Sequence, residues 1–154
     1  MKKITTAGAI LLMTTSIATA GNLDRSGQGI GAIFEDGDYA ELSFGSVSPN
    51  LSGGNSPLSG ANPTGDIAPT YTQLGMAFKT QINDNISMAL IYDQPFGADV
   101  DYATAGYILV TSGATVESDG VTMLARYEIN PNFSVHGGLR YVQASGTYAL
   151  NLPV

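Results

Sequence analysis

The sequence predicts an all-β protein, and more narrowly a transmembrane antiparallel β-barrel. Apolar and polar side chains alternate with period two in segments of about ten residues, which is typical of barrel strands. The connectors between these segments alternate between long and short. Charged residues make up 12% and hydrophobic residues 44% of the 154 residues, which is lean in charge for a soluble domain.

The first twenty residues have the pattern of a secretory signal peptide. Met1–Lys3 supply positive charge, Ala7–Ile17 form an apolar stretch, and Ala18–Ala20 give a small-x-small cleavage site. This stretch is shorter than the ~20 residues that a transmembrane helix needs, so we expect residues 1–20 to be removed on export. No later stretch is apolar enough for such a helix, so a membrane role would require strands. Cysteine is absent, and a hydrogen-bonded barrel is a source of stability without disulfides.

Residues 39–154 contain five expected strands, preceded by a periplasmic segment at 21–38. The strands are expected at Tyr39–Pro49, Ile67–Thr80, Ile86–Asp93, Thr115–Glu128 and Phe133–Tyr148. In each of them apolar side chains dominate one face, although the third strand also has a mixed opposite face. Each strand is long enough to cross a bilayer at a tilt.

The connectors favour a barrel over a soluble β-sandwich, which shares period-two strands. Asn50–Asp66 and Gln94–Gly113 are long, whereas Gln81–Asn85 and Asn130–Asn132 are short. Long loops at one end and tight turns at the other are typical of transmembrane barrels, in which the turns face the periplasm. Tyrosines are also expected toward strand ends, as in an aromatic girdle, at Tyr39, Tyr92, Tyr127 and Tyr141.

Charge and motif spacing exclude several classes of function. The net charge of −7 provides no basic surface for nucleic acid. Gly27, Gly29 and Gly31 follow no strand and precede no Lys-Ser/Thr pair, so backbone flexibility is favoured over a phosphate loop. Glu35, Asp36 and Asp38 lack the spacing of a calcium loop, so a solvated turn is favoured. We expect no metal and no cofactor.

Polar residues of the last two strands share one face. Ser134 and His136 could serve a hydrolase, but no oxyanion element or orienting acid accompanies them, so we expect no enzymatic activity. Arg126 and Arg140 would each cost about 2–4 kcal/mol at the bilayer midplane, so we expect them to face the lumen. There they could attract a ligand carboxylate or form ion pairs with Glu128 or Glu41.

Several motifs, in this order along the chain, resemble the FadL/TodX family of outer-membrane transport proteins. They are Arg25–Gly31, Val47–Gly53, Asp66–Thr70, Ile82–Asn85 and Tyr127–Ser134. The resemblance implies a monomeric barrel of fourteen strands, closed by an N-terminal hatch, that carries long-chain fatty acids or other hydrophobic molecules. This chain would supply about five N-terminal strands of such a barrel.

The family's third strand has an inward kink that opens the barrel sideways, and Asp93–Gly97 falls at that place. Proline cannot donate a ladder hydrogen bond and glycine relaxes the backbone, so a break is expected there. The residues expected to contact a hydrophobic ligand are Leu90, Tyr92, Pro95, Phe96 and Gly97, together with Arg126 and Arg140. The prediction is a passive channel, surrounded by outer-membrane lipids, in the outer membrane of a Gram-negative cell. The alternative is a structural or adhesive surface barrel without transport.

Overall fold

The computed structural model describes residues 23–53, 63–103, 107 and 109–151. Within these residues it consists of one short 3-10 helix and six strands in a single sheet, and every strand pairing is antiparallel. The elements are η1 (Gly31–Phe34), β1 (Tyr39–Val47), β2 (Tyr71–Gln81), β3 (Ile86–Asp93), β4 (Gly97–Asp101), β5 (Gly113–Asn130) and β6 (Phe133–Ala149). The all-β prediction is therefore confirmed.

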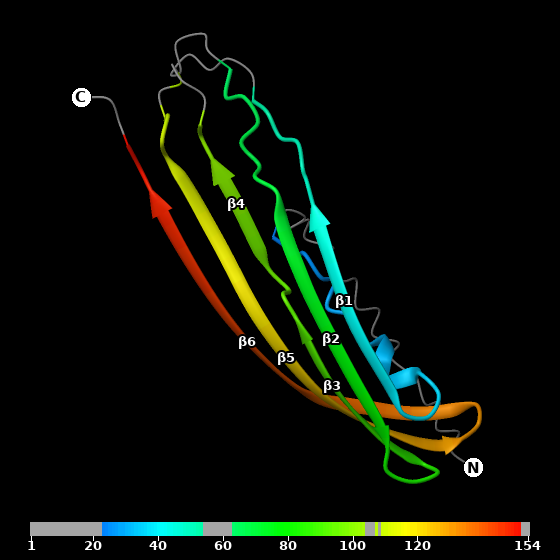
Figure 1. Cartoon of the computed structure of the whole chain (residues 1–154). Helices are drawn as coiled ribbons and strands as arrows, with labels where there is room; N and C mark the ends of the chain where they lie inside the picture. The colour runs from blue at the N-terminus through cyan, green and yellow to red at the C-terminus, as the bar shows by residue number, and fades with distance from the viewer. Residues whose placement is uncertain (1–22, 54–62, 104–106, 108, 152–154) are drawn as a thin grey trace, which may run out of the picture.

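The six strands form five adjacent ribbons of a curved sheet, because β3 and β4 lie one after the other along the same side of β5 (Figure 1). Residues Gly120–Tyr127 of β5 pair with β3, and Gly113–Glu117 pair with β4. β2 and β6 pair with the outer sides of β3 and β5, and β1 pairs with β2. Among the described strands, β1 and β6 thus form the two edges of the sheet.

The strand register confirms the predicted alternation, since apolar residues lie opposite each other on one face across all five ribbons, whereas charged and polar residues occur on the other face. One row of paired residues is apolar, and it consists of Leu42, Met76, Tyr92, Val121 and Tyr141. The adjacent row points to the other face and consists of Glu41, Ala77, Ile91, Thr122 and Arg140. Each face therefore keeps its character across the sheet, as period two requires.

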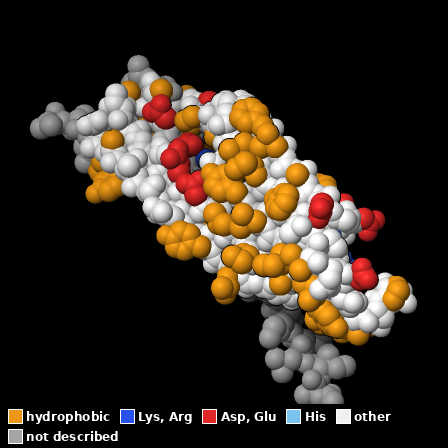
Figure 2. Space-filling model, turned by 60° about the horizontal axis from the view of Figure 1, so that its bottom comes forward, with side chains coloured by type: hydrophobic (Ala, Val, Ile, Leu, Met, Phe, Trp, Pro, Cys, Tyr) orange, Lys and Arg blue, Asp and Glu red, His pale blue; other side chains and the backbone are white. Residues whose placement is uncertain are grey.

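The apolar face is the exposed one. Leu42 and Phe44 are 73% and 74% exposed, and Leu139 is 82% exposed. Apolar side chains spread along one side of the molecule in Figure 2. The opposite face is partly covered by the N-terminal segment (residues 23–38), whose Ile33 is fully buried against a small core on β3 and β5. The inside-outside arrangement is therefore the reverse of that in a water-soluble sheet.

Long and short connections alternate along the chain, as predicted. The tight β2–β3 and β5–β6 turns lie at one end of the sheet, and the β1–β2 and β4–β5 connections lie at the other (Figure 1). In the described part of the chain, no helix is long and apolar enough to cross a membrane.

Two expectations were wrong in detail. The predicted loop Gln94–Gly113 contains β4, whose five residues are too few for a visible alternation, although β5 provides a long edge for them to pair with. Tyr39 does not share the apolar face, because it packs beside the core and its hydroxyl donates to Glu41. Signal peptide residues 1–20 lie outside the described residues.

Candidate functional site

The ribbon formed by β3 and β4 is interrupted at Gln94–Phe96, where the sequence predicts a break. From Asp93 to Gly97 the chain advances four residues, whereas the opposing stretch from Gly120 to Glu117 advances three. One residue is therefore extra, as in a β-bulge. β2 pairs with β3 only from Met76 onward, so its first residues have no partner in β4 among the described pairings. We call the gap between Tyr71–Gly75 of β2 and Gly97–Asp101 of β4 the split.

Side chains replace the backbone hydrogen bonds that the interruption removes. The Ser118 hydroxyl accepts the Phe96 N–H and donates to the Phe96 carbonyl, both at 2.7 Å. Gln94 Oε1 accepts the Leu74 N–H at 3.0 Å, on the β2 side of the split. Since an unsatisfied backbone group away from water is costly, these contacts stabilise the interrupted geometry.

The N-terminal segment enters the split and pairs with the break. Asp24 forms an antiparallel bridge with Phe96, through hydrogen bonds of 2.8 Å from Arg25 N–H to the Pro95 carbonyl and from Gly97 N–H to the Leu23 carbonyl. The Arg25 side chain then crosses the split. Its guanidinium carbon lies 3.8 Å from the centre of the Tyr71 ring of β2.

The same guanidinium reaches Asp99 of β4 in an ion pair of 2.9 Å. The side chains of Arg25 and Asp99 are only 11% and 21% exposed, so water screens this pair weakly. Gly97 allows the approach, because a Cβ at that position would collide with the Arg25 guanidinium. A cavity of about 370 Å³ adjoins this contact and is walled largely by apolar residues, which include Pro49, Leu51, Pro69 and Val100.

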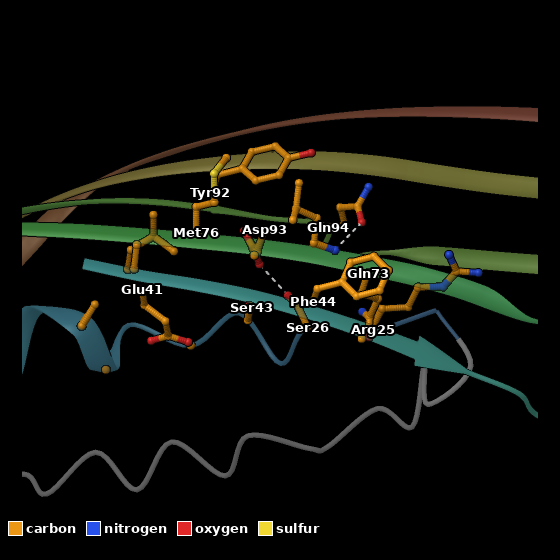
Figure 3. Close-up of a pocket in the computed structure, with 18 of the residues that line it drawn as sticks. Arg25, Ser26, Glu41, Ser43, Phe44, Gln73, Met76, Tyr92, Asp93 and Gln94 are labelled. Carbon is orange, nitrogen blue, oxygen red and sulfur yellow. Dashed lines mark hydrogen bonds between the residues drawn. The ribbon is translucent and has the colours of Figure 1, made fainter. Parts of the chain in front are cut away.

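A polar chain of contacts lies on the covered face beside the break. Arg140 of β6 donates to both carboxylate oxygens of Asp93, at 2.8 and 3.0 Å, and to the Thr122 hydroxyl at 2.6 Å. The Ser26 hydroxyl of the N-terminal segment donates to the same carboxylate, as Figure 3 shows. Gly120 sits between Asp93, Arg140 and Pro95 with no room for a side chain. The N-terminal segment is thus linked through Asp93 to three strands.

A second contact fixes the other end of the N-terminal segment. Lys79 of β2 is 1% exposed, and its ammonium donates at 2.7 Å to each of the carbonyls of Glu35 and Gly37. Phe34 packs edge-on against His136, and Arg126 lies over the Phe34 ring at 5.4 Å. Between the two fixed ends, a cavity of about 500 Å³ separates the segment from β1, β2 and β3 (Figure 3).

The loop end of the site is held by Asp66. Its carboxylate accepts the N–H groups of Leu51 and Ala68, at 3.0 and 3.1 Å. These two backbone hydrogen bonds lower the pKa of Asp66 below its ordinary value of 3.8. Leu51 and Ala68 both line the cavity at the split, so the ionised carboxylate shapes its rim.

The predicted ligand residues fall into three groups. Pro95, Phe96 and Gly97 form the break, and Pro95 is fully buried. Leu90 and Tyr92 point away from it, toward the exposed apolar face, since they pair with Met123 and Val121.

The two predicted arginines share the covered face but lie in different places. Arg126 pairs with Glu128 at 2.6 Å, as one of the alternatives expected, and Arg140 pairs with Asp93 rather than Glu41. Only Arg140 lies at the break. Ser134 contacts Arg126 rather than His136, at 3.1 Å from the Arg126 Nε.

Sequence reasoning missed the residues that occupy the split, namely Arg25, Tyr71, Gln94, Asp99 and Ser118. An arginine in a glycine-rich segment was the one available signal, because such a charge needs a partner when the segment packs on a sheet. Among the described residues, no group of three or more His, Asp or Glu side chains is placed to hold a metal ion.

Comparisons with known proteins found no match among protein-family models, curated proteins or solved structures. The relation to the FadL/TodX family therefore stays a prediction that rests on the motifs alone.

Proposed function

We propose that this chain forms strands of an outer-membrane β-barrel channel through which hydrophobic small molecules, long-chain fatty acids among them, diffuse passively. The observation that carries the proposal is the sheet's reversed polarity. A continuous apolar face is exposed, while the opposite face, which carries the charged side chains beside a small apolar core, is partly covered by the chain's own N-terminal segment. In water such a face would be a liability, whereas in lipid it is the stable arrangement.

The apolar face has dimensions that suit a bilayer. Along β5, every outward-facing residue from Val121 to Ile129 is apolar, and the preceding outward residue is Asp119. The eight residue-to-residue steps from Val121 to Ile129, at about 3.3 Å each, span about 26 Å. At the usual strand tilt this corresponds to an apolar band roughly 20 Å high, close to the ~25 Å of transmembrane barrels. The Tyr92 hydroxyl donates to Asp119, as expected of a tyrosine at the border of the band.

The split supplies a lateral passage between the covered face and the lipid. Its cavity has apolar walls and lies beside the interruption of the sheet. A hydrophobic ligand would leave the channel through this gap when residues 23–26 withdraw. Withdrawal of residues 23–26 would open the Asp24–Phe96 bridge, whereas the pairings among β1 to β6 would stay intact.

The test replaces Pro95 and Gly97 by valine. Valine at position 97 would displace the Arg25 guanidinium and fill part of the adjoining cavity, and valine at position 95 would restore a backbone N–H at the break. Cells that carry P95V/G97V should take up a fluorescent long-chain fatty acid several-fold more slowly than wild type. The control is A125V, which places a valine on the exposed face of β5, far from the split.

Outer-membrane fractionation establishes that each variant reaches the membrane in equal amount. Normal insertion of P95V/G97V together with unchanged uptake would reject the lateral passage. A deletion strain that grows normally on long-chain fatty acids and alkanes would instead favour a structural or adhesive barrel. Recovery of the processed chain as a folded monomer in detergent-free buffer would reject the membrane assignment itself.

A further inference from the structure

We propose that Tyr71, Gly97 and Asp99 form a guanidinium slot, a binding site for arginine on a short peptide, which Arg25 of the same chain occupies in this structure. The proposal concerns binding and does not require that the protein transport anything.

The slot matches a guanidinium on each of its surfaces. The Tyr71 ring covers one face of the planar group, with 3.8 Å from the guanidinium carbon to the ring centre. Gly97 lies against the group where any side chain would collide with it. The Asp99 carboxylate receives an N–H at 2.9 Å. Arginine is planar, permanently charged and stacks on aromatic rings, whereas the compact ammonium of lysine would use the carboxylate alone.

The peptide backbone beside the slot is also recognised. Arg25 N–H donates to the Pro95 carbonyl and the Leu23 carbonyl accepts from Gly97 N–H, each at 2.8 Å. This is the pattern of a short strand added to a sheet edge, in which main-chain bonds give affinity and a side-chain pocket gives specificity. The Ser26 hydroxyl adds one further bond, to Asp93.

Arg25 is part of the same chain as the slot, and this limits the binding of a peptide added in solution. Because residues 23–26 belong to the same chain, their effective concentration at the slot is high. In R25A the tethered backbone keeps only its two hydrogen bonds, and a peptide that adds the guanidinium contacts should displace it, which it should not do in the wild type. The ligand class is a short peptide with arginine as its third residue, as in Leu23–Gln28, in which Asp24 forms the bridge and the chain then turns at Gly27 and Gln28.

The experiment uses the full chain with R25A, folded in detergent micelles, and a fluorescent peptide of sequence Leu-Asp-Arg-Ser-Gly-Gln. Fluorescence anisotropy should show saturable binding to R25A that is at least tenfold tighter than binding to wild type. A peptide with citrulline, which keeps the shape of arginine without its charge, should bind at least tenfold more weakly to R25A. The double variant R25A/D99N should lose binding. The matched control is R25A/D101N, which alters the other carboxylate of β4 and should retain binding.

Equal binding of the citrulline peptide, or undiminished binding to R25A/D99N, would overturn the guanidinium slot. The proposal would also be overturned if the peptide did not bind to R25A protein whose circular dichroism spectrum shows that it is folded. If R25A fails to fold, R25K replaces it in the experiment, because lysine keeps the positive charge and the backbone contacts. The arginine peptide should displace the lysine at position 25, which binds the slot more weakly than arginine does. The two tests are independent. Unchanged fatty-acid uptake would not alter the peptide-binding results, and absence of peptide binding would not alter the uptake results.

Discussion

Two adjacent glycines of β6 have opposite surroundings. A Cβ at Gly138 would collide with the backbone carbonyl of Met123, whereas nothing lies within 4 Å of a Cβ at Gly137. We expect G138A to destabilise the sheet by about 1–3 kcal/mol, because the paired strand must shift to make room. G137A should be neutral or slightly stabilising. Thermal unfolding of both variants in the same detergent measures the difference, and equal unfolding temperatures would contradict the close β5–β6 packing.

Asp93 and Arg140 form an ion pair of 2.8 Å, and their side chains are 12% and 21% exposed. Each charge therefore needs the other for its stability in the folded protein. Removing one partner of a fully buried pair costs about 3–5 kcal/mol, and this partly exposed pair should cost less. D93N should therefore destabilise the fold, because the neutral amide leaves Arg140 without an ion-pair partner and keeps one acceptor oxygen in place of two. The double variant D93N/R140M should recover part of the loss, because no uncompensated charge remains. A double-mutant cycle from chemical denaturation checks this, and strictly additive effects would show that the pair does not interact.

Asp66 gives the loop end of the site a defined pH dependence. Its pKa in the folded protein is lowered by the N–H groups of Leu51 and Ala68. Its contribution is therefore present above the ordinary pKa of 3.8 and is lost as the pH falls through the lowered value. Cleavage of the β1–β2 connection should be faster in D66N than in wild type at pH 7. With pepsin at a pH below the lowered pKa the two should be cleaved alike, and a persistent difference there would contradict the proposed cause.

At the scale of the elements, the N-terminal segment is fixed at two separated points, and Lys79 fixes one of them. K79M keeps the length of the side chain but removes the bonds to the Glu35 and Gly37 carbonyls. The segment should then leave the sheet more often, which exposes the peptide bond after Arg25 to trypsin. We expect cleavage there to accelerate at least threefold, as measured by mass spectrometry. Cleavage after Arg140 within β6 serves as the internal control and should not change.

Five strands were predicted within a few residues of their bounds, because long alternation is a strong local signal. β3 was predicted with its observed bounds, Ile86–Asp93. β4 was missed because its pairing with β5 depends on a one-residue shift across the break, which is a property of two strands rather than of one. Period two also placed Arg126, His136 and Arg140 on one face correctly.

The contacts at the split could not be predicted, since they join residues far apart in the sequence. Arg25 and Asp99 are 74 positions apart, and Asp93 and Arg140 are 47 apart. No local pattern indicates which of several acids a given arginine will reach. The break itself was predictable because proline and glycine act locally, through the backbone of their own strand.

At the scale of the whole molecule, the two faces of the sheet should respond oppositely to added charge. Leu139 and His136 lie on opposite faces of β6, and Leu139 is 82% exposed. If the apolar face contacts hydrocarbon, L139R should weaken insertion into lipid vesicles by about 2–4 kcal/mol, whereas H136R on the covered face should change it little. Urea titration of vesicle-inserted protein measures both. Equal effects of the two substitutions would argue against a lipid-facing side.

The two edge strands have a consequence for handling the protein. β6 offers seventeen residues of backbone along one edge, and its charged side chains are limited to Arg140, with His136 as a second ionisable group. β1 offers nine more at the opposite edge, with Glu41 as its charge. Neither has the lysines or prolines that discourage one sheet from joining another. Concentrated solutions prepared without lipid or detergent should therefore grow ordered stacks, seeded where one molecule's last ribbon meets the first ribbon of its neighbour.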